Sequence, residues 1–255
     1  MAYQFILVQT PAPGIAKITL NRPDALNALS PALVQELKQA TEAIAADSSL
    51  KVMIVTGAGR AFSAGVDLKA LNESIQGGKF SADQILIDGA SFIDTMQQMP
   101  QVTIAMVNGF CYTGATEFML AFDLIVAAEE AQIGDTHAKW GIAPKWGMTQ
   151  RLQQKVGLLK AMEMSFTAKP VSGKEAERIG LVNRAVPLAE LETHTLQLAQ
   201  DVLANSAQTI AAMKQFYYFG ANHTISQGLE KEYKTQVTIN DREAFLRDFE
   251  KNKKK

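Results

Sequence analysis

Short apolar segments alternate with amphipathic helical segments between residues 15 and 128 of the chain. Apolar runs at 15–20, 52–55, 102–107 and 124–128 have the length and composition of buried strands. Apolar stripes with helical spacing lie between them, at 33–44 and 85–96. Strands that alternate with helices indicate layers in which crossover helices connect the strands of a sheet. The alternation therefore limits this part of the chain to an α/β fold.

Several predicted helices carry recognisable start signals. Ser30 and Pro31 supply an N-cap followed by proline at the first helical position. Ser172 and Glu175 form the pattern of a capping box, which opens a helix ending near Gly180. Strand signals nearly vanish after residue 150, and helical patterns continue through the segments 188–204, 207–219 and 229–249. The last third of the chain is therefore predicted to be helical.

Composition excludes several classes of protein. The 255 residues include 25 Lys+Arg and 26 Asp+Glu, and a net charge of −1 argues against a nucleic-acid-binding protein. The single cysteine, Cys111, cannot form an internal disulfide and fits a reducing compartment. We find no signal-peptide pattern and no apolar stretch near the ~20 residues that cross a bilayer. We therefore expect a soluble, cytoplasmic protein without membrane contact.

Two glycine-rich segments each follow a predicted strand, one from Phe62 to Leu68 and one from Asn108 to Glu117. Small residues let a ligand approach main-chain N–H groups where a helix begins, and two such groups can share one developing oxyanion. Glu117 lies three residues beyond Gly114, so its carboxylate belongs beside that site. The simpler alternative is that these glycines only form tight turns. A dinucleotide loop is disfavoured because Phe62 stands where its third glycine belongs.

Together with four other motifs, these segments resemble the crotonase family, also called the enoyl-CoA hydratase/isomerase superfamily. The resemblance runs from residue 15 to about residue 186 and implies a spiral of ββα units over residues 1–190. It further implies a helical trimerisation region over residues 191–255 and assembly as a homotrimer or homohexamer. The motifs that carry it are Leu20-Asn-Arg-Pro-Asp-Ala-Leu-Asn-Ala28, Phe62-Ser-Ala-Gly-Val-Asp-Leu68, Ala105-Met-Val-Asn-Gly109 through Glu117, Phe122-Asp-Leu-Ile125, Thr149-Gln-Arg-Leu152 and Arg178-Ile-Gly-Leu-Val-Asn183.

The resemblance implies an acyl-CoA enzyme that works through a thioester enolate. The N–H groups of Val66 and Gly114 would form the oxyanion hole, and Glu117 would be the principal acid/base. Coenzyme A is part of the substrate, so neither a separate cofactor nor a metal is implied. The residues expected to contact the CoA portion are Arg22, Ala64, Gly65, Asp67 and Leu68, with Lys251 near its nucleotide end.

One position departs from the hydratase pattern. Hydratases of this family use two glutamates, and the second position falls on His137. Three interpretations stay open: His137 transfers a proton, because imidazole titrates near neutrality, or it shapes the acyl pocket, or it is a buried structural histidine. We expect Asp135 to point away from His137 and do not assign it as the partner of this histidine.

Aromatic residues near this position predict either a narrowed, aromatic-lined acyl pocket or ordinary packing of the protein interior. Trp140 and Trp146 stand where many relatives carry small residues, and Tyr112 lies in the second glycine-rich segment. Reversible hydration of a 2-enoyl-CoA is the leading reaction. Isomerisation or decarboxylation of a CoA thioester, with Glu117 or His137 as sole acid/base, is the alternative. A hypothesis of another class is a catalytically weak scaffold that binds CoA thioesters.

Overall fold

The computed structural model describes residues 3–78, 81, 83–243 and 245–247, whose strands form two sheets. The larger sheet has six strands, and all of its neighbouring strands are parallel except the first pair. In spatial order they are β1 (Ile6–Ala12), β2 (Ile15–Leu20), β3 (Val52–Gly57), β5 (Val102–Val107), β7 (Leu124–Ala128) and β10 (Arg184–Val186). The smaller sheet contains β4 (Ala61–Ser63), β6 (Phe110–Tyr112), β8 (Gln132–Gly134) and β9 (Val171–Ser172).

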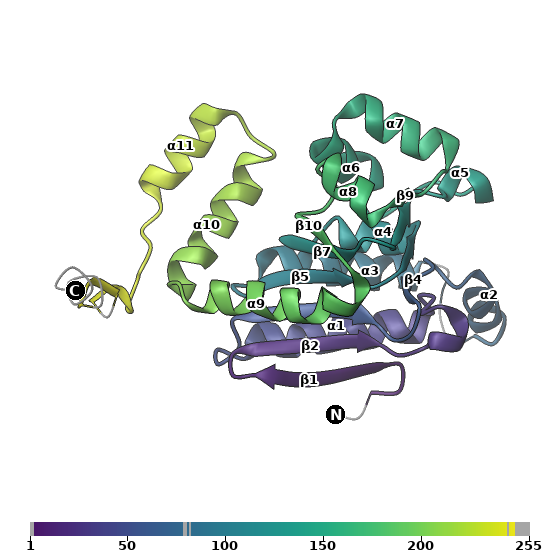
Figure 1. Cartoon of the computed structure of the whole chain (residues 1–255), viewed down its shortest axis with the longest axis horizontal. Helices are drawn as coiled ribbons and strands as arrows, with labels where there is room; N and C mark the ends of the chain where they lie inside the picture. The colour runs from purple at the N-terminus through teal and green to yellow at the C-terminus, as the bar shows by residue number, and fades with distance from the viewer. Residues whose placement is uncertain (1–2, 79–80, 82, 244, 248–255) are drawn as a thin grey trace.

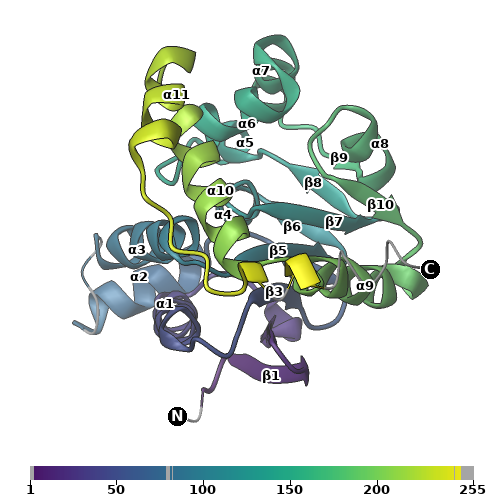
Figure 2. The ribbon, with the colours of Figure 1, turned by 90° about the vertical axis from the view of Figure 1, so that its left-hand side faces the viewer.

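Consecutive strand pairs build the two sheets together. In the pairs β3–β4, β5–β6 and β7–β8, the first strand joins the larger sheet and the second joins the smaller one. Helices follow each pair, and this repeat is the spiral of ββα units that the sequence predicts. The helices of this part are α1 (Pro31–Ala46), α2 (Leu68–Gln76), α3 (Gln84–Gln98), α4 (Gly114–Met119) and α5 (His137–Trp140). Figure 2 shows α1, α2 and α3 on one side of the sheets and α8 (Gly173–Arg178) on the opposite side.

The predicted helix starts are confirmed. The Ser30 hydroxyl accepts a hydrogen bond from the backbone N–H of Leu33, and Pro31 is the first residue of α1. Ser172 caps α8 (Gly173–Arg178) in the same way through the N–H of Glu175. The Glu175 carboxylate pairs with Arg178 instead of returning to the cap, so only half of the capping box forms.

The second half of the chain is mainly helical but not in every predicted detail. Its helices are α6 (Met148–Val156), α7 (Leu158–Thr167), α8, α9 (Leu191–Leu203), α10 (Ala207–Gly220) and α11 (Ile225–Lys234), and short 3-10 turns lie at Pro23–Ala25 and Leu188–Glu190. A continuous helix over 229–249 was wrong, because α11 ends at Lys234 and residues 235–240 are not helical. Val237 and Thr238 lie in this break, and β-branched residues lower helix propensity. Strands β9 and β10 escaped prediction because they have only two and three residues.

Helix α10 makes polar contacts with α3, with the loop after α3 and with the turn before β7. Figure 1 shows α10 and α11 standing to one side, apart from α6 and α7. Lys214 is the buried residue of α10, and its Nζ donates to the carbonyls of Met96 (2.6 Å) and Gln101 (2.9 Å). The same Nζ lies 2.8 Å from Asp123 Oδ2, and the Tyr218 hydroxyl donates to Asp123 Oδ1 at 2.8 Å. One carboxylate thus connects α10 to the turn before β7.

Among the described residues, no helix combines the length and apolar character needed to span a bilayer.

We expect Lys214→Met to destabilise the protein by about 3 kcal/mol, because the half-buried Asp123 carboxylate and two carbonyls lose a charged donor. Urea unfolding measures this loss, and hydrogen exchange of the α10 amides locates it. Lys169→Met is the matched control, since Lys169 is exposed. Equal stability of the two variants would contradict the role given to Lys214.

Candidate active site

Two glycine-bearing turns meet at the N-terminal end of α4. Gly65 has a φ of +93°, and a Cβ at this position would lie 2.8 Å from the carbonyl oxygen of Tyr112 and 3.5 Å from the nitrogen of Gly114. A Cβ on Gly114 would lie 3.3 Å from Cγ2 of Val66. Only glycine permits this backbone approach, because the close partners of Gly65 include main-chain atoms and its φ disfavours other residues. Val66 and Gly114 therefore lie next to each other.

The backbone N–H groups of Val66 and Gly114 are left over by the surrounding hydrogen bonds. Leu29 pairs with this turn by donating to the Gly65 carbonyl at 2.8 Å and accepting from Asp67 N–H at 3.1 Å, which skips the N–H of Val66. Gly114 is the first residue of α4, where an N–H has no partner within the helix. Within the part of the chain that the structure describes, neither N–H donates to another residue. Their assignment as oxyanion donors stays a prediction, and it is compatible with two neighbouring N–H groups that have no partner among the described residues.

The residue before Gly114 has a strained backbone. Thr113 has φ +55° and ψ −118°, a region that a β-branched residue rarely adopts. Its N–H donates to the Gly134 carbonyl at 3.0 Å, and its hydroxyl hydrogen bonds with that of Thr136. These contacts hold the start of α4 against the segment after β8.

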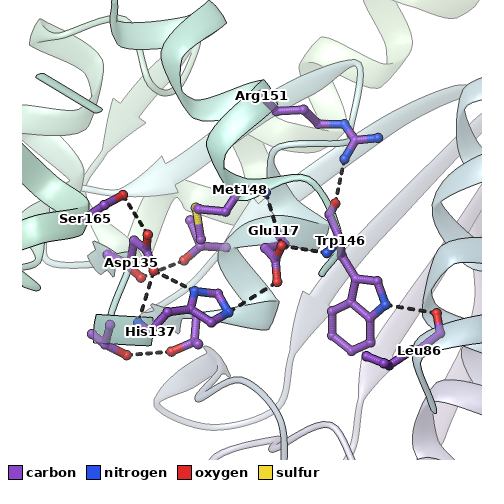
Figure 3. A network of polar contacts seen from close by, with 12 residues as sticks. Leu86, Glu117, Asp135, His137, Trp146, Met148, Arg151 and Ser165 are labelled. Carbon is purple, nitrogen blue, oxygen red and sulfur yellow. Dashed lines mark hydrogen bonds and ion pairs between the residues drawn. The ribbon is translucent and has the colours of Figure 1, made fainter. Parts of the chain in front are cut away.

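Glu117 is 2% exposed and is held by the turn that leads into α6. Its Oε1 accepts hydrogen bonds from the N–H groups of Trp146 (2.7 Å) and Met148 (3.1 Å) (Figure 3). Gly147 between them has a φ of +100°, which allows both N–H groups to reach one oxygen. Arg151 closes the turn by donating to the Trp146 carbonyl at 2.6 Å. The other oxygen of Glu117 is thereby directed to His137.

His137 lies between two carboxylates. Its Nε2 is 3.4 Å from Glu117 Oε2, and its Nδ1 is 2.6 Å from Asp135 Oδ1 (Figure 3). The expectation that Asp135 faces away from His137 was wrong, because residues two positions apart would share a face even in a strand, and here the chain turns from β8 into α5 between them. In this turn Asp135 Oδ1 also accepts from the backbone N–H of His137 at 3.1 Å, and Ser165 Oγ donates to Oδ2 at 2.6 Å.

Burial by itself would lower the pKa of His137. The hydrogen bonds to Asp135 and Glu117, together with the charges of both carboxylates, outweigh burial and raise the pKa of His137 to about 9. Burial likewise opposes ionisation of Asp135, but hydrogen bonds from His137 and Ser165 keep the pKa of its carboxyl below the ordinary value. At neutral pH the ring is therefore an imidazolium with one N–H toward each carboxylate.

The Trp146 side chain fills the space beside Gly114. It is 5% exposed, its ring centroid lies 4.7 Å from that of Phe118, and its Nε1 donates to the Leu86 carbonyl at 3.0 Å. A Cβ on Gly89 would lie 2.5 Å from Cε2 of the indole, and one on Gly114 would lie 2.8 Å from Cζ3. The two glycines therefore make room for the indole.

The residues expected to contact the CoA portion surround the turn after β4. Arg22 Nη2 pairs with Asp67 Oδ2 at 3.0 Å, and its Nη1 donates to the Ala28 carbonyl at 2.5 Å. Ala64 and Gly65 precede Val66 in this turn, and Leu68 is exposed at the start of α2. Four of these residues therefore lie in one short segment, and Arg22 is joined to that segment by its ion pair with Asp67. Their contact with a ligand stays a prediction.

The other predicted site residues are more dispersed. Tyr112 ends β6, half-buried, with its ring 5.7 Å from that of Phe110. Trp140 lies at the end of α5 and is 62% exposed, and it has no hydrogen bond to Glu117 or His137 among the described residues. Lys251 lies outside the described residues.

Sequence reasoning missed two members of this site, Asp135 and Ser165. A local signal for Asp135 was present, because Gly134 favours a turn and an aspartate at the start of a turn readily accepts a hydrogen bond from the backbone N–H two residues later. No local signal points to Ser165, which meets Asp135 across 30 positions of sequence.

Within residues 3–78, 81, 83–243 and 245–247, no group of three or more His, Cys, Asp or Glu side chains is arranged to hold a metal ion. The expectation of no metal and no separate cofactor stays a prediction.

Comparisons with known proteins place the chain in a family. The profile of the family described as Enoyl-CoA hydratase/isomerase matches residues 11–253. The chain is 33% identical over 227 residues to the probable enoyl-CoA hydratase 1, peroxisomal, of Arabidopsis thaliana, which covers 89% of this chain and 83% of the relative. It is also 33% identical over 234 residues to the short-chain-enoyl-CoA hydratase of Clostridium acetobutylicum, covering 91% and 84% of the two chains.

A solved structure gives the same result for the fold. The enoyl-CoA hydratase from Bacillus anthracis matches with a TM-score of 0.89 and 32% identity, over 98% of this chain and 97% of the other. The protein therefore belongs to the enoyl-CoA hydratase/isomerase family and is an enzyme of that family. The crotonase resemblance and the α/β spiral expected from the sequence are confirmed.

The raised pKa of His137 makes a prediction for stability. A group whose folded pKa lies above its unfolded value stabilises the fold fully below the unfolded value, here near 6.5, and loses this effect as pH rises through about 9. The difference in unfolding free energy between wild type and His137→Gln should therefore shrink by on the order of 3 kcal/mol between pH 6 and pH 10. Urea unfolding at both pH values measures it.

His194→Gln is the control, because His194 is an exposed histidine with a surface ion pair. Its difference from wild type should change little over this interval. A His137→Gln difference that is equal at pH 6 and pH 10 would contradict the charged state assigned to His137.

Proposed function

We propose that the protein catalyses the reversible hydration of a 2-enoyl-CoA thioester. The observation that carries this proposal is the direct pairing of a buried carboxylate, Glu117, with a buried imidazolium, His137, at 3.4 Å. Such a pair holds one proton acceptor and one proton donor in a single site at neutral pH. The free N–H groups of Val66 and Gly114 nearby suit the thioester oxygen. Names of the relatives, which are enoyl-CoA hydratases, agree with this reaction.

Each group then has one role in the addition of water. Glu117 takes a proton from water while the water oxygen bonds to Cβ of the substrate. Electrons move through Cα to the thioester oxygen, where the N–H groups of Val66 and Gly114 stabilise the negative charge of the enolate. His137 gives its Nε2 proton to Cα, and the carbonyl re-forms. The product is the 3-hydroxyacyl-CoA, with neutral Glu117 and neutral His137 left behind.

The contact between Glu117 and His137 also resets the site. After the addition, the proton on Glu117 Oε2 faces the unprotonated Nε2 of His137 across the 3.4 Å contact. Transfer of this proton restores the carboxylate and the imidazolium. The interpretation of His137 as a proton-transfer group is therefore the one we adopt among the three considered.

The substrate's CoA portion and acyl chain are assigned to separate groups of residues. For the CoA portion we retain Arg22, Ala64, Gly65, Asp67, Leu68 and Lys251, with no separate cofactor or metal. For the acyl chain, Trp146 gives the strongest support, because its buried indole contacts the region of Gly114 beside Glu117. Tyr112 and Trp140 complete the proposed acyl pocket. We infer that the pocket is short.

Isomerisation is the second candidate, since the family description includes it and the site holds one carboxylate, Glu117, next to His137. In that reaction one group removes a proton from Cα and returns it at Cγ. A decarboxylase and a CoA-thioester scaffold without turnover are less favoured, because neither needs both the proton acceptor and the proton donor of the Glu117–His137 pair.

We further propose that the protein assembles as a homotrimer or homohexamer in the cytoplasm, through a helical region over 191–255. Support comes from large apolar side chains exposed on α10 and α11, among them Tyr217, Ile225, Leu229 and Tyr233. Light scattering after gel filtration tests the assembly. Neither a nucleic acid nor a membrane is among the proposed partners.

We expect Glu117→Gln to lower the rate of crotonyl-CoA hydration by roughly 10²- to 10⁴-fold, because the amide cannot accept the water proton. The loss of absorbance of the conjugated thioester measures the rate. The control is Glu163→Gln on the exposed face of α7. A wild-type rate no higher than that of Glu117→Gln would overturn the proposal, and formation of 2-enoyl-CoA from 3-enoyl-CoA alone would favour isomerisation.

We expect Trp146→Leu to shift the acyl preference toward longer chains. Removing the indole opens space beside Gly89 and Gly114, while the backbone N–H that binds Glu117 is kept. The ratio of kcat/KM for an eight-carbon over a four-carbon 2-enoyl-CoA should rise roughly tenfold or more. Phe166→Leu, at an exposed position of α7, is the control. An unchanged ratio would exclude Trp146 as the limit of the pocket.

A further inference from the structure

We propose that Asp135, held in place by Ser165, is a positioning residue that fixes the ring of His137 and keeps its Nε2–H directed at Glu117. The inference rests on the proposed function for the role of His137 as a proton donor. Neither Asp135 nor Ser165 contacts Glu117 in the described hydrogen bonds, so both act through the histidine.

The contacts of Asp135 determine the ring orientation. Its Oδ1 lies 3.1 Å from the backbone N and 2.6 Å from Nδ1 of the same histidine. A ring bound at Nδ1 on one side has only Nε2 left to present on the other side. Nε2 is the atom that faces Glu117. Rotation of the ring would break the short Asp135 contact and separate the donor from Glu117.

Ser165 fixes the carboxylate itself. It projects from α7 and donates its hydroxyl to Asp135 Oδ2 at 2.6 Å (Figure 3). With Oδ1 bound to His137 and Oδ2 bound to Ser165, both oxygens of this 3% exposed carboxylate are satisfied. A buried carboxylate with this set of donors stays ionised, and its charge favours the imidazolium form of His137. Helix α7 therefore contributes to the site through one hydroxyl.

The charged groups around His137 come from different elements. Asp135 precedes α5, Glu117 comes from α4, and both are carboxylates in contact with the ring. Arg151, on α6, binds the Trp146 carbonyl, and burial lowers the pKa of its guanidinium. Removing the charge of Asp135 leaves Glu117 as the one carboxylate in contact with the ring, within the described residues. The pKa of His137 should then fall toward its ordinary value of 6.5.

The first variant is Asp135→Asn, which keeps the shape and removes the charge. We expect the basic limb of the kcat/KM profile, which reports the free enzyme, to move from about pH 9 toward pH 6.5. At pH 8 this shift lowers kcat/KM by roughly 10- to 30-fold, with KM itself within about twofold. A purely structural role for Asp135 would not move the limb. Asp201→Asn, the same exchange at an exposed position of α9, should leave the profile unchanged.

The second measurement does not depend on turnover. The chain has three histidines, and NMR titration of their Cε1–Hε1 signals gives each pKa, with His137→Gln identifying the relevant signal. Asp135→Asn should lower the pKa of His137, and Ser165→Ala should lower it by a smaller amount. Ser165→Ala carries the test if Asp135→Asn does not fold, because it removes a single hydroxyl from a partly buried position.

The outcomes separate the two proposals. An unchanged titration of His137 in both variants overturns the positioning role, even if the wild type hydrates enoyl-CoA. A lowered pKa in an enzyme that turns over no enoyl-CoA supports the positioning role and overturns the proposed function. A fall in kcat/KM without any movement of the basic limb also overturns the inference.

Discussion

The contact between Glu117 and His137 is the interaction on which the arrangement of the site depends. Two carboxylates and one imidazole are buried together, with exposed fractions of 2% for Glu117, 3% for Asp135 and 6% for His137. Burying such groups is costly unless every one of them has a partner. Each carboxylate oxygen has one: two backbone N–H groups on Glu117 Oε1, His137 on Oε2 and on Asp135 Oδ1, and Ser165 on Oδ2. Helices α4 to α7 must therefore keep their places for the charges to stay buried.

The repeat of the fold explains how these groups meet. The turns after β4, β6 and β8 supply Val66, then Gly114 and Glu117, then Asp135 and His137. These strands are parallel neighbours in the smaller sheet, so their carboxyl ends lie at one edge. Three successive repeats thus deliver an N–H donor, an N–H donor with a carboxylate, and an ion pair to the same place. The strained Thr113 and the positive φ of Gly65 are the local consequences of bringing main-chain groups this close.

The sequence predicts the parts of this structure that depend on local pattern. The strands at 15–20, 102–107 and 124–128, the cap at Ser30 and the positions of Glu117 and Gly114 follow from periodicity, capping chemistry and motif spacing. The placement of Asp135 was wrong because residues two positions apart share one face of a strand, so even a continued strand would have put Asp135 on the side of His137. Ser165 could not be found, since its meeting with Asp135 depends on how α7 packs. Strands β4, β6 and β8 have three residues each, too few for a periodic signal to stand out.

Trp146 links the size of the proposed acyl pocket to the position of the proposed base, Glu117, through two different parts of one residue. Its backbone N–H binds Glu117, and its side chain occupies the room left by Gly89 and Gly114. Because any residue except proline has the same backbone donor, the side chain can change without removing the hydrogen bond that orients the carboxylate. The indole itself is fixed by its Nε1 bond to Leu86 and its packing on Phe118. The proposed acyl selectivity and the proposed proton transfer are therefore separable in this site, although they meet at a single position in the chain.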